Sequence, residues 1–187
     1  MSDREERVEA LADQAPEATT KDTLIARIAH RTARVGVIGM GYVGLPLAVA
    51  FARAGFTVSG IDLDAAKCAE VNAGRSYITD VPSSDLAALV QEGRLHATDD
   101  YGVLAEMDVG TICVPTPLGK AKDPDISYIL RAAEALGQYV HTGMLVVLES
   151  TTYPGTTEEE LLPRLVRNGC QVGEDVFLAF SPERVDP

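Results

Sequence analysis

The stretch VGVIGMGYVGLPLAVAF, residues 35–51, limits most strongly what this chain of 187 residues can fold into. It begins as a short apolar run typical of a buried strand and ends as an amphipathic run typical of a helix. Gly39, Gly41 and Gly44 stand at the junction with the spacing G-x-G-x-x-G. Glycines there permit a tight turn and let another group approach the backbone closely. We therefore ask which ligand the main chain of this stretch could bind.

The rest of the chain repeats the alternation of short apolar runs and longer amphipathic runs. Strands are expected at residues 35–38, 56–62, 95–98, 108–114, 144–151 and 175–182. Helices are expected at residues 43–54, 64–74, 82–93, 101–107, 125–140 and 156–169. Apolar strands separated by helices indicate a parallel sheet covered on both faces. The expected fold class is α/β, a doubly wound parallel sheet of the Rossmann type with a charged N-terminal extension.

Composition divides the chain into two parts. Residues 1–33 are rich in charged residues, alanine and threonine, and we expect them to be a mobile or helical extension. Residues 34–187 form the expected domain. The chain ends in SPERVDP, seven residues beyond Phe180, without a closing helix, which predicts a domain cut from a longer protein.

Charge and residue content exclude several classes of partner. A net charge of −12 argues against nucleic acid, which requires a basic face. No apolar run reaches the roughly 18 to 20 residues that span a membrane, and the N-terminus has no signal-peptide core. The three cysteines are scattered, and the three histidines have no partners at ligand spacing, so neither disulfides nor a metal site is expected. These features favour a cytoplasmic protein.

A glycine motif alone is a weak signal, but its surroundings make this one specific. It follows an expected strand, opens a helix, and has Asp62 at the end of the next strand, 18 residues beyond Gly44. The N–H groups of a helix N-terminus bind a pyrophosphate, and a carboxylate at the Asp62 position accepts hydrogen bonds from ribose hydroxyls. A carboxylate also repels a 2′-phosphate, so NAD is favoured over NADP. The alternative is a glycine turn with a purely structural role.

Polar residues follow three further strands at the edge where ligands bind in open α/β sheets. Thr116 follows the strand at 108–114, Thr151 ends the strand at 144–151, and Glu183 follows the strand at 175–182. We expect these three side chains to face one crevice. Ordinary roles remain open for them, because Thr151 can cap a helix and Glu183 can be a solvated loop charge.

Four separated motifs, taken in order, resemble a known family. The segments GVIGMGYVGLPLA, ICVPTPL, LESTTYPGTTEE and LAFSPER together resemble the N-terminal NAD-binding domain of the UDP-glucose/GDP-mannose dehydrogenase superfamily. The sequences of these segments are most similar to the bacterial UDP-N-acetylglucosamine 6-dehydrogenase branch. The resemblance covers residues 34–187. It implies oxidation of a UDP-sugar at C6 from alcohol to carboxylate, with reduction of two NAD molecules.

The resemblance also implies roles for individual residues. The cofactor would be bound by Gly39, Met40, Gly41, Tyr42, Val43, Gly44, Asp62, Lys67, Thr116, Thr151 and Glu183. Asp62 and Lys67 would bracket the adenosine ribose. Thr151 would hold a water molecule or the reacting oxygen, and Glu183 would be the general base for thioester hydrolysis.

The resemblance stops short of the whole reaction. The second oxidation in this family needs a nucleophilic cysteine from a later domain, and Cys68, Cys113 and Cys170 do not match it. We therefore expect this chain to bind NAD without completing the reaction, and the full-length family member to be a homo-oligomer. The product would suit polysaccharide biosynthesis. The alternatives are a UDP-glucose or UDP-N-acetylmannosamine 6-dehydrogenase, or a truncated non-catalytic NAD-binding module.

Overall fold

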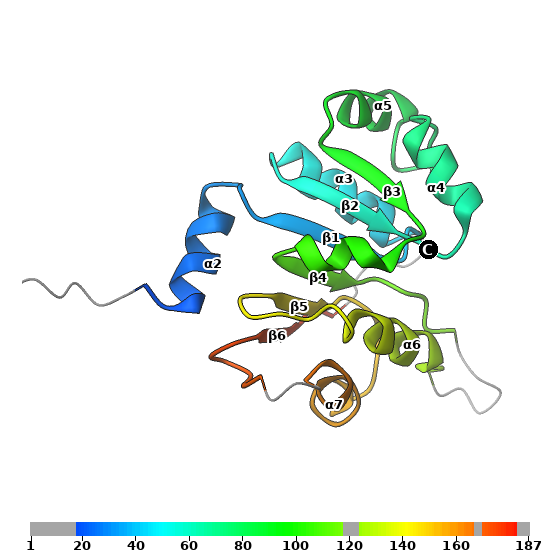
Figure 1. Ribbon diagram of the computed structural model, residues 1–187. Coiled ribbons are helices and arrows are strands. Elements are labelled where there is room, and N and C mark those ends of the chain that lie inside the picture. Colours follow the sequence, from blue (N-terminus) through cyan, green and yellow to red (C-terminus); the bar gives the residue numbers. More distant parts are fainter. Residues whose placement is uncertain (1–17, 118–123, 167–169, 183–187) are drawn as a thin grey trace, which may run out of the picture.

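A six-stranded parallel sheet forms the centre of the molecule (Figure 1). The computed structural model describes residues 18–117, 124–166 and 170–182. The strands are β1 (Arg34–Ile38), β2 (Thr57–Ile61), β3 (Leu95–Thr98), β4 (Val109–Ile112), β5 (Leu145–Leu148) and β6 (Phe177–Phe180). Their order is β3-β2-β1-β4-β5-β6, and every neighbouring pair is parallel. This order confirms the predicted doubly wound sheet, with the change of winding direction between β1 and β4.

Helices cover the sheet in two groups (Figure 1). The helical elements are α2 (Thr20–Ala29), α3 (Gly44–Arg53), α4 (Ala65–Asn72), α5 (Ser83–Gln91), the 3-10 turn η1 (Tyr101–Glu106), α6 (Ser127–Leu136), the π-helical turn η2 (Thr156–Leu161) and α7 (Leu162–Leu165). Helices α3, α4 and α5 pack beside the β1–β3 half, whereas α6 and α7 pack beside the β4–β6 half. Each helix covers apolar strand residues, which explains why these strands show little polar alternation.

The two helix groups enclose two hydrophobic cores, one on each side of the sheet. Val35 and Val37 of β1 belong to the core beneath α3, α4 and α5, while Ile38 belongs to the core with α6 and η1. This division follows from the alternation of side chains along a strand. Gly36 stands where η1 approaches β1, because a Cβ there would lie 2.9 Å from a methyl of Leu104.

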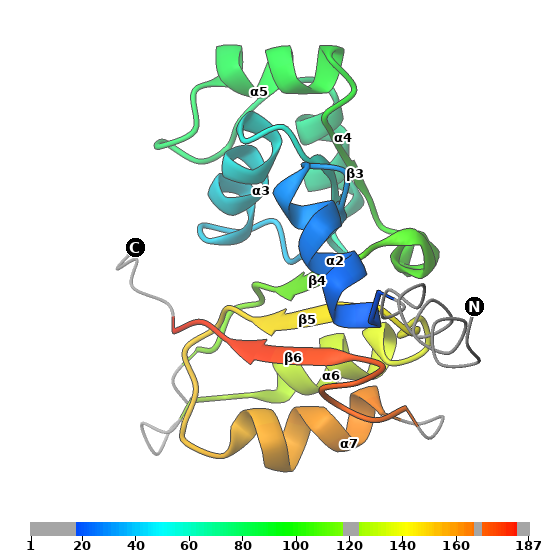
Figure 2. The same ribbon diagram turned by 90° about the vertical axis from the view of Figure 1, so that its left-hand side faces the viewer.

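Helix α2 lies at the amino ends of the strands, in front of the sheet in Figure 2. A capping box begun by Thr19 starts the helix, and Leu24 is buried against the domain. Arg27 forms an ion pair with Asp108, whose side chain is only 7% exposed. Asp108 also accepts a 2.7 Å hydrogen bond from the backbone N–H of Arg34. One carboxylate thus connects α2 with the beginnings of β1 and β4.

The helix expected at 156–169 is present as two pieces. Gly155 has φ +94° and begins the π-helical turn η2, and α7 continues directly to Leu165. Pro163 has no N–H to donate to the carbonyl four residues earlier, so a regular α-helix through this point is disfavoured. The expected end of the helix, residues 167–169, lies outside the described residues.

Candidate dinucleotide-binding site

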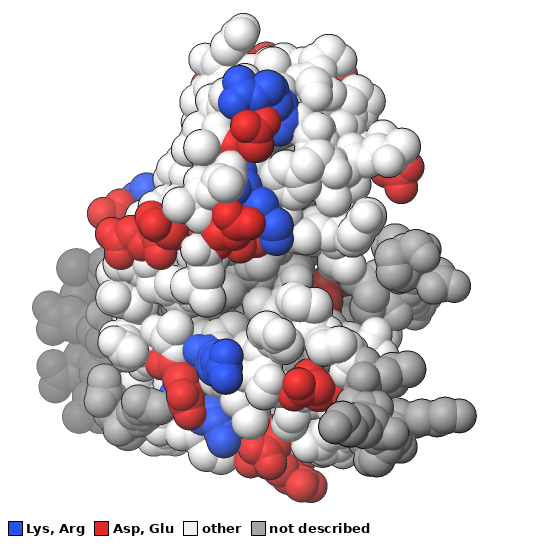
Figure 3. Space-filling model, turned by 90° about the vertical axis from the view of Figure 1, so that its right-hand side faces the viewer, with Lys and Arg blue, Asp and Glu red and all other residues white. Residues whose placement is uncertain are grey.

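A cleft of about 610 Å³ opens at the carboxyl ends of the strands, beside the change of winding direction. Figure 3 looks at this edge of the molecule and shows it hollowed between an upper and a lower half. Residues from several elements line the cleft, among them Gly39, Asp62, Lys67, Tyr101, Val114 and Arg131. Its position is the one at which open α/β sheets bind ligands.

The three glycines of the turn have three different surroundings. Gly39 has φ +93°, and a Cβ there would lie 2.8 Å from the carbonyl oxygen of Cys113. A Cβ on Gly44 would lie 1.7 Å from the carbonyl oxygen of Gly39, so the helix can begin at this point only with glycine. A Cβ on Gly41 would meet no atom within 4 Å. Gly39 and Gly44 are therefore required by the fold, whereas Gly41 borders open space.

The first backbone groups of α3 are available to a ligand. Within the described part of the chain, no group accepts a hydrogen bond from the N–H groups of Gly41, Tyr42, Val43 or Gly44. The first turn of α3 carries no acidic side chain. Unpaired N–H groups and the positive end of the helix dipole favour an anion such as a phosphate.

Asp62 directly follows β2 and joins the glycine turn to the next helix. Its Oδ2 accepts a 2.9 Å hydrogen bond from the N–H of Met40 and lies 3.4 Å from Nζ of Lys67. Its Oδ1 accepts a hydrogen bond of 3.0 Å from the N–H of Asp64. A carboxylate offers about four acceptor positions, so further acceptor capacity remains for a hydroxyl donor. The side chain is 13% exposed and lines the cleft.

Among the predicted site residues, Gly39, Asp62 and Lys67 line the cleft, whereas its lining does not include Thr116 or Thr151. Lys67 borders it beside Asp62, and Tyr42 projects from the turn with 65% of its surface exposed. Met40 is fully buried, and its N–H is taken by Asp62. Thr116 is half-buried and Thr151 is exposed, each in the segment after its strand. Glu183 lies outside the described residues.

Side-chain hydrogen bonds connect the ends of three neighbouring strands. Ser150 Oγ donates to the carbonyl of Val114 at 2.9 Å, which joins the segments that carry the two predicted threonines. Ser181 Oγ donates to Oε1 of Glu149 at 2.8 Å, which joins the ends of β5 and β6. No role was expected for these four residues, which lie just beyond the ends of β4, β5 and β6. They fix the edge of the sheet beside the cleft.

Other cleft residues carried no signal in the sequence. Tyr128 and Arg131 belong to α6, and only the three-dimensional fold brings them into the same cleft as Asp62. Tyr101 comes from η1, and burial together with the nearby Asp62 carboxylate raises the pKa of its hydroxyl. Leu63, at 79% exposure, was detectable as an apolar residue at a strand end. These residues line the cleft together with Asp62 and Lys67.

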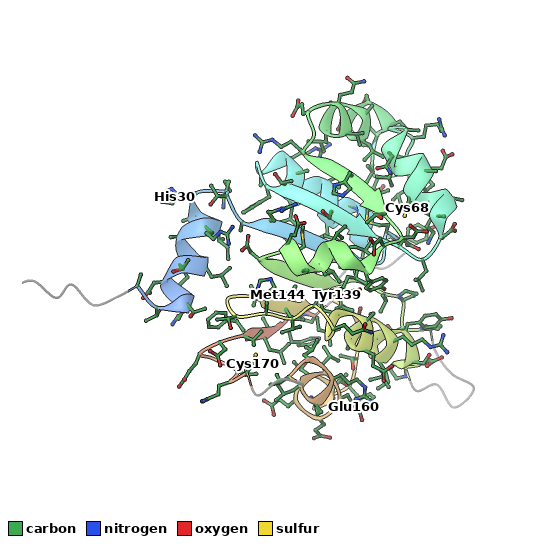
Figure 4. All side chains as sticks on the ribbon, in the orientation of Figure 1. His30, Cys68, Tyr139, Met144, Glu160 and Cys170 are labelled. Carbon is green, nitrogen blue, oxygen red and sulfur yellow. The ribbon has the colours of Figure 1, made fainter. Side chains whose placement is uncertain are left out.

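Cys68 and Cys170 lie in different parts of the fold. Cys68 donates a hydrogen bond of 3.4 Å to the carbonyl of Asp62, and burial raises the pKa of its thiol. Cys170 lies in the opposite half of the molecule (Figure 4). In the described residues, no three His, Cys, Asp or Glu side chains are grouped as a metal site requires. None of the described helices is long and apolar enough to cross a membrane.

The parallel sheet, the glycine turn with unpaired N–H groups and the carboxylate after β2 define a dinucleotide-binding domain of the Rossmann type. Comparison with known proteins identifies the family. Residues 33–187 match the NAD binding domain of the UDP-glucose/GDP-mannose dehydrogenase family, and the chain belongs to this family.

Individual relatives share between one third and two fifths of their aligned residues with this chain. UDP-N-acetyl-D-glucosamine 6-dehydrogenase of Pseudomonas aeruginosa is 39% identical over 155 residues, which cover 82% of this chain and 36% of the relative. UDP-N-acetyl-D-mannosamine dehydrogenase of Pyrococcus horikoshii is 40% identical over 158 residues, covering 82% and 37%. The crystal structure of NDP-N-acetyl-D-galactosaminuronic acid dehydrogenase from Methanosarcina mazei superposes with a TM-score of 0.77 at 36% identity, covering 87% and 37%. The chain thus spans little more than a third of the length of these relatives.

Proposed function

We propose that this chain is the cofactor-binding part of an NAD-dependent nucleotide-sugar 6-dehydrogenase. The full reaction would oxidise a primary alcohol at C6 of a UDP-sugar to a carboxylate, consuming one water and reducing two NAD to NADH. The family assignment and the relatives at 39% and 40% identity support this proposal.

One observation carries the choice of cofactor. The carboxylate of Asp62 holds the glycine turn by the N–H of Met40, while the N–H groups of the following residues have no described acceptor. A pyrophosphate fits the unpaired N–H groups, and an adenosine ribose fits the remaining acceptor positions of Asp62. A 2′-phosphate at the same place would meet a carboxylate, which favours NAD over NADP.

Bound NAD would supply the hydride acceptor, and the residues of the chain would position it. Gly39, Gly41 and Gly44 would let the backbone approach the pyrophosphate, and Asp62 with Lys67 would bracket the ribose. Thr116 would lie along the cofactor.

Two residues are assigned to the reacting end by the family motif. Thr151 would hold a water molecule or the reacting oxygen, and Glu183 would take a proton during hydrolysis of the thioester. The hydrogen bonds of Ser150 and Glu149 support the first role, because they fix the backbone on the N-terminal side of Thr151.

The sugar is proposed from the relatives. The two compared sequences and the compared structure are named as enzymes of N-acetylated sugars, so we propose UDP-N-acetylglucosamine or a related UDP-N-acetylhexosamine as substrate. UDP-glucose is the alternative within the family. We further propose that the full-length protein acts in the cytoplasm as a homo-oligomer and contributes to polysaccharide biosynthesis.

A fluorescence titration with NADH and NADPH tests the cofactor assignment. The 187-residue chain should bind NADH saturably and NADPH at least about tenfold more weakly, because like charges meet at Asp62. Equal affinities would contradict the assignment of Asp62. Failure of a folded chain to bind NADH would favour a domain that depends on residues outside this chain.

A second measurement tests the proposed division of the reaction. We expect the 187-residue chain to reduce no NAD when it is mixed with UDP-N-acetylglucosamine, UDP-N-acetylmannosamine or UDP-glucose. Turnover by this chain would show that the cysteine step does not require further residues. A longer protein that binds NADH but oxidises none of these sugars would favour a non-catalytic NAD-binding module.

A further inference from the structure

The segment between α4 and α5 reaches the glycine turn through one side chain. Tyr77 Oη donates a 2.7 Å hydrogen bond to the carbonyl oxygen of Met40, across 37 positions of the chain. The Tyr77 side chain belongs to none of the motifs that identify the family. Burial, followed by the charge of Asp62, raises the pKa of the Tyr77 hydroxyl, so the hydroxyl remains a donor at neutral pH.

Met40 is consequently held at three points. Its N–H donates to Asp62, its carbonyl accepts from Tyr77, and its thioether packs where a Cβ on Gly60 would lie 2.6 Å from the sulfur. The residue at the centre of the turn is therefore fixed before any ligand arrives.

The bond from Tyr77 sets the direction of the next N–H group. The peptide between Met40 and Gly41 is planar and trans, so its C=O and its N–H point in opposite directions. Because the C=O points to Tyr77, the Gly41 N–H points away from Tyr77. A Cβ on Gly41 would meet no atom within 4 Å, so this part of the turn borders free space.

The segment that carries Tyr77 is itself anchored. Ile78 and Val81, on the C-terminal side of Tyr77, are buried in the core with α3 and α5. Ser76 donates its N–H to Ser83 Oγ at 3.0 Å, and its hydroxyl bonds to the backbone of Ile78. The tyrosine is thus presented by a fixed support.

We propose that Tyr77 is a positioning residue for pyrophosphate binding, acting through the Met40 carbonyl to aim the Gly41 N–H. This proposal rests on the proposed function, because it concerns the same NAD site. Without the hydroxyl, the Met40–Gly41 peptide can rotate, and part of the binding energy is lost in ordering it.

The variant Y77F tests the proposal, with Y153F as the matched control. Tyr153 is exposed, and its hydroxyl has no described hydrogen-bond partner. Y77F should raise the Kd for NADH about three- to tenfold, the equivalent of one lost hydrogen bond. It should weaken ADP-ribose by the same factor but leave adenosine, which lacks the pyrophosphate, within twofold of wild type. Y153F should change none of these values.

Amide hydrogen exchange of the ligand-free chain gives a readout that does not depend on NAD. Y77F should accelerate exchange of the Met40 amide, which donates to Asp62, and of the Leu45 amide, which donates to the Gly41 carbonyl, and should leave the β1 and β4 amides unchanged. Equal loss of adenosine and ADP-ribose affinity, or unchanged exchange in the turn, would overturn the positioning role. If wild type binds no NADH but Y77F still loosens the turn, the proposed function fails while the restraint by Tyr77 stands.

Discussion

The backbone N–H of Met40 donates a 2.9 Å hydrogen bond to the carboxylate of Asp62, across 22 positions of the chain. The two sequence signals for a dinucleotide, the glycine motif and the acidic residue after the next strand, are therefore one connected structure. A change in Asp62 alters both the charge at the proposed ribose position and the support of the turn. Mutations at this site must be interpreted with both effects in view.

Alanine at two glycines of the turn should separate folding from ligand binding. G44A places a methyl group 1.7 Å from the carbonyl oxygen of Gly39, so we expect a loss of at least about 3 kcal/mol in the free energy of unfolding. G41A places its methyl group in free space, so its stability should lie within about 1 kcal/mol of wild type. NADH affinity of G41A should nevertheless fall at least about tenfold, because the methyl group keeps the pyrophosphate from the backbone.

Urea denaturation and NADH titration of both variants provide the check. Normal NADH binding by G41A would place the pyrophosphate elsewhere. Wild-type stability of G44A would show that α3 can begin at a different position. The conclusion that the turn requires glycine at residue 44 would then be wrong.

Replacing Asp62 by serine should change the preference between the two cofactors. D62S removes the negative charge, while Lys67 and Arg131 still line the cleft. We expect NADH affinity to fall at least about tenfold and the ratio of NADPH to NADH affinity to rise by a similar factor, because the 2′-phosphate no longer meets a carboxylate. D80S, on the exposed segment before α5, should leave both affinities unchanged. A D62S variant with an unchanged affinity ratio would refute ribose recognition by this carboxylate.

The ion pair between Arg27 and Asp108 should stabilise the domain more than the pair between Arg34 and Glu106. In the first pair Asp108 is 7% exposed and Arg27 is 47% exposed, whereas in the second pair neither partner is buried, at 42% and 66%. Double-mutant cycles with alanine should give a coupling energy of about 1–3 kcal/mol for the first pair and under about 1 kcal/mol for the second. Equal coupling energies in urea denaturation would show that the burial of Asp108 does not strengthen its ion pair with Arg27.

The sequence predicted the parts of the fold that arise from local periodicity. The strand at 35–38 and the helix at 43–54 were found within one or two residues, because an apolar run and its flanking glycines determine both. Asp62 was proposed as a site residue because of its spacing from Gly44, and the structure places it in the cleft with a hydrogen bond to Met40. The hydrogen bond of Tyr77 to Met40 was not predictable, since it joins residues of different segments that only the folded chain brings together.

The same limit applies to buried polar residues that do not belong to a motif. Asp108 was treated as the first residue of a strand, and nothing in the sequence indicates that its carboxylate holds both Arg27 and the N–H of Arg34. Ser150 lies in a hydroxyl-rich segment, but which of its neighbours it would bond was undetermined. Such contacts depend on distances between elements, which periodicity does not encode.

The raised pKa of Tyr101 should make stability fall at alkaline pH. Burial is the larger cause of the shift and the Asp62 carboxylate the smaller one, so the folded state keeps the phenolic proton at a pH where the unfolded chain releases it. A group of this kind contributes stability that is complete below its ordinary pKa of about 10 and is lost as pH rises through the folded-state pKa. The slope of the free energy of unfolding against pH reaches at most about 1.4 kcal/mol per pH unit for one proton.

We expect urea denaturation between pH 8 and pH 11 to show wild type losing more stability than Y101F, which has no proton to release. L104V, on the same turn, should lower stability by a constant amount at every pH, because Leu104 is buried and does not ionise. Parallel pH curves for wild type and Y101F would show that Tyr101 titrates alike in the folded and unfolded states.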